Sequence, residues 1–239
     1  MIHPVYLTVL GYVVITGSVD ATRGFGSLTR TGVAEFVGLL FILYLPMIAI
    51  FAASLVATSA RRAGAGELLA ALPVSARGRA AAVILAGLAP AALGGLAALT
   101  VWYLDRGAAK PSIPHTDLAL AGTPLLYLGV TCLAVAAARW LPWPGAPVAV
   151  LIGLVLWVAN TRGSSHAAAV LTAPWVAGPD TDRAFVVAGY SDAWHLVYLA
   201  GLVGLAATAA LYRDNLRRMV AVGAVVGVPT LTAAIAQLP

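Results

Sequence analysis

Hydrophobic residues are gathered into long runs along the chain, and short polar links separate the runs. A membrane-spanning helix needs about 20 mostly apolar residues, and several runs reach or approach that length. Backbone groups inside a bilayer must satisfy their own hydrogen bonds, so each run is predicted to be a helix. There are seven runs: residues 5–19, 32–60, 80–104, 118–138, 146–160, 193–211 and 219–236.

The overall composition supports a membrane location. Hydrophobic residues make up 61% of the chain, charged residues only 10%, and the mean hydropathy is +0.94. Soluble domains carry about 25% charged residues, so this chain cannot cover a surface that faces water. We therefore predict an all-α integral membrane protein with residues 1–239 in a single transmembrane domain. The first and fifth runs are short for a span.

The positive charge of the chain indicates topology. The formal net charge of +5 comes mainly from arginines in short links, which points away from nucleic acid binding. If segment 61–79 is cytoplasmic, three short links on that side hold eight arginines, and the longer opposite segments hold six basic residues. The chain is then a multi-pass plasma membrane protein with a cytoplasmic N-terminus and an external C-terminus. The eight arginines of the three short links are Arg61, Arg62, Arg77, Arg79, Arg139, Arg213, Arg217 and Arg218.

The chain has a single lysine among many arginines, which is typical of GC-rich bacterial coding.

Two further patterns concern packing and the outer face. The longest link is 162–192, and its apolar piece at 167–176 is too short to cross a bilayer. We predict that this link forms an external re-entrant cap. Small residues spaced four apart allow close contacts between helices, and they occur at Gly87/Ala91/Gly95 and at Gly223/Gly227.

Segment 61–79 reads "RRAGAGELLAALPVSARGR" and interrupts the apolar pattern. Gly64 and Gly66 allow the chain to leave the second run sharply. Glu67 suits the positive end of a short helix, which Pro73 then ends. Ser75 is placed to cap the helix of the third run.

This short helix has one apolar face, because its leucines lie at i, i+1 and i+4. A helix of about two turns is marginal alone in water. It must therefore lie on lipid headgroups or on a partner protein, and the physics of the segment leaves both open. The leucines are Leu68, Leu69 and Leu72.

The stretch "GELLAALPVSARGR" resembles the intracellular coupling-helix segment of ABC-2 type transporter permeases. In that family a Glu-Leu-Leu element ends in Leu-Pro-Val-Ser, and basic residues and the third span follow. The long external link between the fifth and sixth runs also fits the family layout. The residues that carry the match are Glu67, Leu68, Leu69, Leu72, Pro73, Val74 and Ser75, with Arg77 among the basic residues that follow.

The resemblance implies a six-helix type-2 ABC exporter core, to which residues 219–236 add a seventh span. It implies that segment 61–79 docks on a cytoplasmic ABC ATPase, with the leucines as buried anchors and with Glu67 and the arginines as a polar rim. Two ATPase copies and a second permease, identical or homologous, complete such a transporter. ATP and Mg²⁺ bind the ATPase, and the permease forms the path for export of a hydrophobic or amphipathic substrate.

Other functions find less support in the residues. A Walker A loop needs a Gly-Lys-[Ser/Thr] sequence, but the only lysine, Lys110, lies between Ala109 and Pro111. We therefore predict that the chain is not an enzyme and holds no cofactor or metal ion of its own. An accessory membrane protein that anchors a larger complex is the first alternative. A secondary transporter is another, although few ionisable groups lie within the runs.

Overall fold

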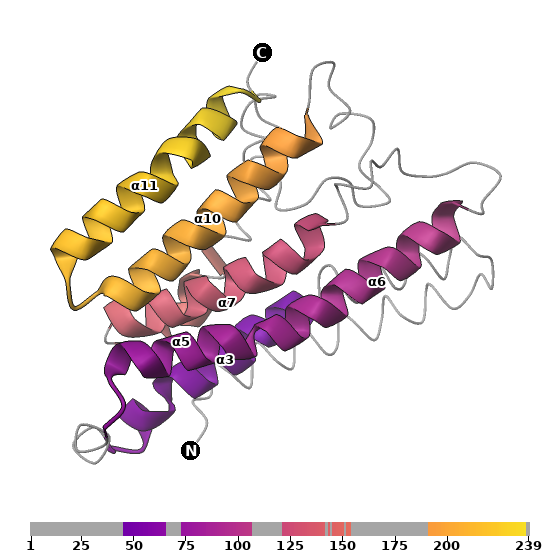
Figure 1. The fold of residues 1–239 in the computed structure, drawn as a ribbon. Helices are drawn as coiled ribbons and strands as arrows, with labels where there is room; N and C mark the ends of the chain where they lie inside the picture. The colour runs from indigo at the N-terminus through magenta and orange to yellow at the C-terminus, as the bar shows by residue number, and fades with distance from the viewer. Residues whose placement is uncertain are drawn as a thin grey trace.

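The computed structural model describes residues 45–65, 73–106, 121–141, 143, 145–150, 152–153 and 191–237. All regular structure in these ranges is helical, without a strand. Six helices of these ranges make up most of the fold (Figure 1): α3 (Leu45–Arg62), α5 (Ala76–Ala86), α6 (Leu88–Arg106), α7 (Gly122–Trp140), α10 (Asp192–Tyr212) and α11 (Leu216–Ile235). Residues 146–150 and 152–153 are helical as well.

Four helices in the described part of the chain are long and apolar enough to cross a membrane. They match the third, fourth, sixth and seventh predicted runs, so the helices predicted there are confirmed. Helix α3 covers the later part of the second run. The first run and most of the fifth lie outside the described residues, and the six-helix exporter core stays a prediction. The four spans are Ala76–Thr100, Gly122–Trp140, Ala193–Tyr212 and Leu216–Ile235.

Helix α7 lies at the centre of the described helices. Helices α3, α5, α6 and α10 all pack against it, and α11 packs on α10 at the edge of the bundle (Figure 1). Many of its side chains are small and buried, such as Cys132, Ala134 and Ala138. Because lipid tails are as apolar as leucine, helices in a membrane associate through close packing at small residues of this kind. Helix α7 therefore forms the core of the bundle.

Two buried clusters fix the relative direction of the helices. The first joins Ile50 of α3 to Val130 of α7. The second joins Ala80, near the start of α5, to Val135 of α7 and to Ala210, near the end of α10. The start of α5 and the ends of α7 and α10 consequently lie at one end of the bundle. The arginine-rich links of the sequence meet at this end.

Gly87 separates α5 from α6 and lets both approach α7. Its amide donates to the carbonyl oxygens of Val83 at 3.2 Å and Ile84 at 3.0 Å, so the two helices continue almost as one. A Cβ at position 87 would lie 2.8 Å from Cγ2 of Thr131 on α7, closer than real side chains come. The close contact predicted from the small residues at 87, 91 and 95 is thus confirmed at Gly87.

Helices α10 and α11 approach each other at a glycine of α10. A Cβ at Gly201 would overlap the Thr230 side chain of α11. The sequence pattern favours Gly223 and Gly227 of α11 instead. No atom of the described residues lies within 4 Å of a Cβ at Gly223, and the nearest to one at Gly227 is 3.9 Å away. The close contact between α10 and α11 therefore depends on Gly201, which the spacing pattern did not single out.

Large apolar side chains cover the outward faces of α6 and α11. Leu93 and Leu96 of α6 are exposed, as are Val225 and Val228 of α11. In a soluble monomer, contiguous apolar surface on this scale marks an interaction site or an aggregation hazard. On helices long enough to span a membrane, the same surface faces acyl chains. The outer faces thus agree with the membrane location predicted from the composition.

We expect Gly201→Ala to destabilise the bundle, because the added methyl group must push α11 away from α10. Overpacking of this kind costs about 1–3 kcal/mol. Thermal denaturation of the purified chain in mild detergent measures the loss. Gly223→Ala is the matched control, since a methyl group there meets open space and alanine favours a helix by about 1 kcal/mol over glycine. Equal losses in the two variants would contradict the described contact.

Candidate functional site

The structure describes both flanks of segment 61–79. At the first flank Gly64 has a φ angle of +65°, in the left-handed region that favours glycine. The chain therefore turns sharply off the end of α3, as predicted. At the second flank the described chain resumes at position 73 and enters α5 at Ala76. The residues between the flanks lie outside the described residues, and they include Gly66 and the predicted contacts Glu67, Leu68, Leu69 and Leu72.

Ser75 caps α5, as the sequence predicts. Its backbone is extended, and its Oγ accepts a hydrogen bond from the amide of Gly78 at 3.0 Å. Arg79 donates from Nη1 to the carbonyl oxygen of Val74 at 2.6 Å, which folds the preceding residues back against the first turn of α5. Pro73 is exposed, and the Val74 side chain is 49% exposed. The turn at 73–75 is thus braced by two hydrogen bonds and presents an apolar side chain.

Arg77 ties the start of α5 to the end of α10. Its Nη2 donates to the hydroxyl oxygen of Tyr212 at 2.7 Å, and its Cζ lies 4.2 Å from the centroid of the Tyr212 ring. A cation–π contact at an exposed site contributes about 0.5–1 kcal/mol. The two residues are 135 positions apart. The predicted rim residue Arg77 therefore also has a structural partner on another span.

Arg139, in the last turn of α7, fastens the end of α10 and the link to α11. Its side chain is only 13% exposed. Its Nη1 donates to the carbonyl oxygen of Ala210, in the last turn of α10, where carbonyl groups lack intrahelical partners. Its Nη2 pairs with Oδ2 of Asp214 at 2.5 Å. The neighbouring Trp140 donates from Nε1 to the carbonyl oxygen of Ala209 at 2.9 Å.

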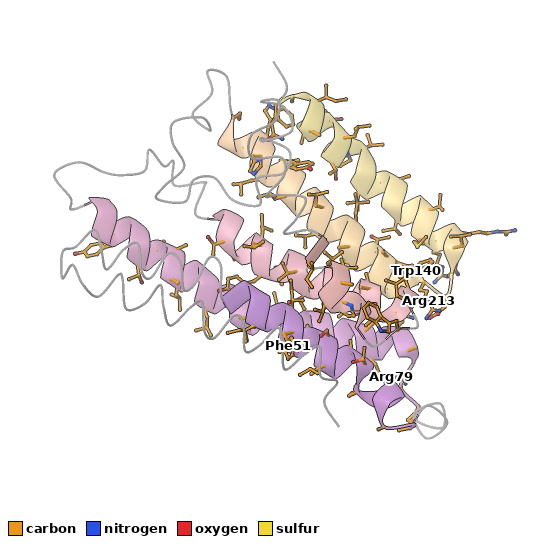
Figure 2. All side chains as sticks on the ribbon, turned by 180° about the vertical axis from the view of Figure 1, so that it is seen from behind. Phe51, Arg79, Trp140 and Arg213 are labelled. Carbon is orange, nitrogen blue, oxygen red and sulfur yellow. The ribbon has the colours of Figure 1, made fainter. Side chains whose placement is uncertain are left out.

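These contacts form one connected group, which we name the polar joint. Figure 2 shows Arg79, Trp140 and Arg213 gathered at this end of the helices. Because the donors and acceptors belong to α5, α7, α10 and the link to α11, the start of α5 cannot move without breaking contacts or moving the ends of its neighbours. The arrangement suits transmission of force. The polar joint consists of Arg77, Arg139, Trp140, Tyr212 and Asp214.

A second buried polar contact lies at the other end of α10 and α11. Nδ1 of His195 is 2.8 Å from Oε1 of Gln237, and both side chains are buried. Gln237 also donates from Nε2 to the carbonyl oxygen of Ala233 at 2.7 Å. The contact fastens the start of α10 to the end of α11. In the described ranges no three His, Cys, Asp or Glu side chains come together as metal ligands would.

The structure describes four of the predicted docking residues, and they lie together at the exposed start of α5: Pro73, Val74, Ser75 and Arg77. The predicted external cap at 162–192 lies outside the described residues, except for its last two positions. The sequence pattern indicated only a topological role for Arg139 and gave no sign of its pairing with Asp214. The two residues are 75 positions apart, so no local pattern could join them.

No family model, no curated protein and no solved structure matches the chain.

We expect Arg139→Gln to lower the free energy of unfolding by about 1.5–3 kcal/mol, because a charged donor to the Ala210 carbonyl is lost. Thermal denaturation in mild detergent again supplies the measurement. Asp214→Asn is the control, since this carboxylate is 65% exposed and an exposed ion pair contributes at most about 1 kcal/mol. A loss in Asp214→Asn as large as that in Arg139→Gln would show that the ion pair, not the helix-end contact, dominates.

Proposed function

We propose that this chain is the permease subunit of an ATP-binding cassette exporter of the ABC-2 type. Its spans form the path for a hydrophobic or amphipathic substrate, and a separate cytoplasmic ATPase supplies the energy. The observation that carries the proposal is the braced, exposed turn at 73–75, which follows the Glu-Leu-Leu stretch and leads directly into a membrane-spanning helix.

Support comes first from the stiffness of that turn. A docking element that transmits force needs a rigid connection to the spans it moves. The Ser75 cap and the hydrogen bond from Arg79 to the Val74 carbonyl tie the turn to α5. The contact between Arg77 and Tyr212 ties α5 to α10. A push on Val74 therefore reaches two membrane-spanning helices through short, directional contacts.

Further support comes from the chemistry of the segment. In the proposed complex Leu68, Leu69 and Leu72 fill a cleft of the ATPase, as buried apolar anchors carry most of the energy of an interface. Glu67 and Arg77 lie on the polar rim. The ATPase, not this chain, binds ATP and Mg²⁺. Two ATPase copies act on two permeases, and their nucleotide-driven closure switches the spans between inward-open and outward-open states.

We expect a probe attached at Val74 to cross-link to an ATPase that carries a Walker A loop. Cys132 is the only cysteine and it is buried, so Val74→Cys supplies a single accessible thiol on the exposed turn. The variant is labelled with a photoactivatable maleimide in native membranes, and the adducts are identified by mass spectrometry. The accessory-protein alternative predicts adducts that contain no ATPase.

Tyr103→Cys is the matched control for this experiment. Tyr103 is 70% exposed and lies near the end of α6, at the opposite end of the bundle from Val74. It should label equally well and give no ATPase adduct. The proposal fails if a labelled, correctly inserted Val74→Cys protein gives no ATPase adduct, or if the two positions give the same one.

A further inference from the structure

We propose that the headgroup of an anionic phospholipid binds a cluster of arginines where α11 begins, with its acyl chains along the exposed face of α11. The arginine cluster consists of Arg213, Arg217 and Arg218. This site is separate from segment 61–79, and the inference holds whether or not the chain is a transporter.

Positive charge at this end of the bundle greatly exceeds negative charge. Residues 73–79, 139–141 and 212–219 together hold six arginines and one carboxylate, that of Asp214. Asp214 is already paired with Arg139. The cluster arginines are all exposed, and in the part of the chain that the structure describes no carboxylate forms an ion pair with any of them. Their charge is therefore available to an anion from outside the chain.

The stability of α11 does not account for these arginines. The first turn of α11 holds no acidic residue, and cations near the start of a helix are unfavourable for its dipole. The cap is supplied by Asn215 instead, whose Oδ1 accepts from the amide of Arg218 at 3.0 Å. Without a bound anion, Arg217 and Arg218 therefore destabilise the start of α11. An anion bound between them would offset this destabilisation.

The surface beside the cluster is apolar, which selects a lipid over a free anion. Val225 follows Arg218 by seven residues and Val228 follows Arg217 by eleven, so each valine shares a helix face with an arginine. These valines are 75% and 67% exposed. Helix α11 lies at the edge of the described bundle, and only its α10 side is covered there (Figure 1).

The depth of the cluster also fits a headgroup. Trp140, whose indole is exposed at the same end, marks the headgroup level that tryptophan prefers. A lipid phosphate at that level lies beside the arginines, and its acyl chains run along Val225 and Val228. Clusters of arginine beside membrane-spanning helices attract anionic lipids with about 1 kcal/mol per residue. Charge and apolar stripe together match one molecule with an anionic head and an apolar tail.

Lipid titration of the purified full chain in neutral detergent, followed by native mass spectrometry, tests the inference. Phosphatidylglycerol and phosphatidylcholine with identical acyl chains are compared, and inorganic phosphate is tested as a competitor. We expect phosphatidylglycerol to bind at least about tenfold more tightly than phosphatidylcholine. The double variant Arg217→Gln/Arg218→Gln should lose about thirtyfold in affinity for phosphatidylglycerol, from about 1 kcal/mol per arginine.

Two control variants separate charge from fold. Arg217→Lys/Arg218→Lys keeps the charge and should keep most of the preference for phosphatidylglycerol. Arg106→Gln, at the end of α6 and the opposite end of the bundle, should leave it unchanged. If the double glutamine variant does not insert, the wild-type chain decides. Its preference for phosphatidylglycerol must decrease when the salt concentration is raised from about 0.05 M to about 0.5 M, because salt screens exposed charges.

Several results would overturn the inference. Equal binding of phosphatidylglycerol and phosphatidylcholine would overturn it. A preference for phosphatidylglycerol that stays unchanged in the glutamine variant or in added salt would also overturn it. Displacement of the lipid by millimolar inorganic phosphate would show a general phosphate site. Loss of a chain dimer in the glutamine variant, with no change in lipid binding, would assign the face to a second copy of the chain.

Discussion

Helices inside a bilayer gain little from burying apolar side chains against one another, so this bundle depends on how closely its neighbours can approach α7. The small residues along α7 and the glycine at 87 permit that approach. Helix α7 is consequently the best-buried span, whereas α6 and α11 keep large apolar side chains on their outer faces. The same requirement explains why Gly201 faces Thr230 where α10 meets α11. Close packing thus places the ends of the spans near one another, and polar contacts can then form there.

The two ends of the bundle use polar contacts of different kinds. At one end the polar joint involves charged side chains, and it connects α5, α7 and α10 to the link before α11. At the other end the contact between the His195 and Gln237 side chains fastens α10 to α11. Charged hydrogen bonds are about twice as strong as neutral ones, and partial exposure reduces the cost of burying the charges. The end that carries the braced turn at 73–75 is therefore also the end at which charged side chains connect the helices.

The features that the sequence predicted correctly are those with local signals. The helical runs follow from hydropathy, the cap at Ser75 from its position before the third run, and the turn at Gly64 from the freedom of glycine. Contacts over 135, 75 and 42 positions leave no local trace, so the partners of Arg77, Arg139 and His195 appeared only in the structure. Glycines are so frequent in this chain that spacing alone could not single out Gly201. The leucines that carry the family resemblance lie outside the described residues, and their role stays a prediction.

Purification of this chain from its native host in mild detergent, with every co-purifying protein identified, tests the central claim most directly. We predict an ATPase with a Walker A loop in a stable complex, and its loss from Leu69→Asp while the variant still inserts in the membrane. Leu69→Met, which keeps the apolar anchor, should retain the ATPase. A stable native complex that contains no ATPase would contradict the account and would favour an accessory membrane protein.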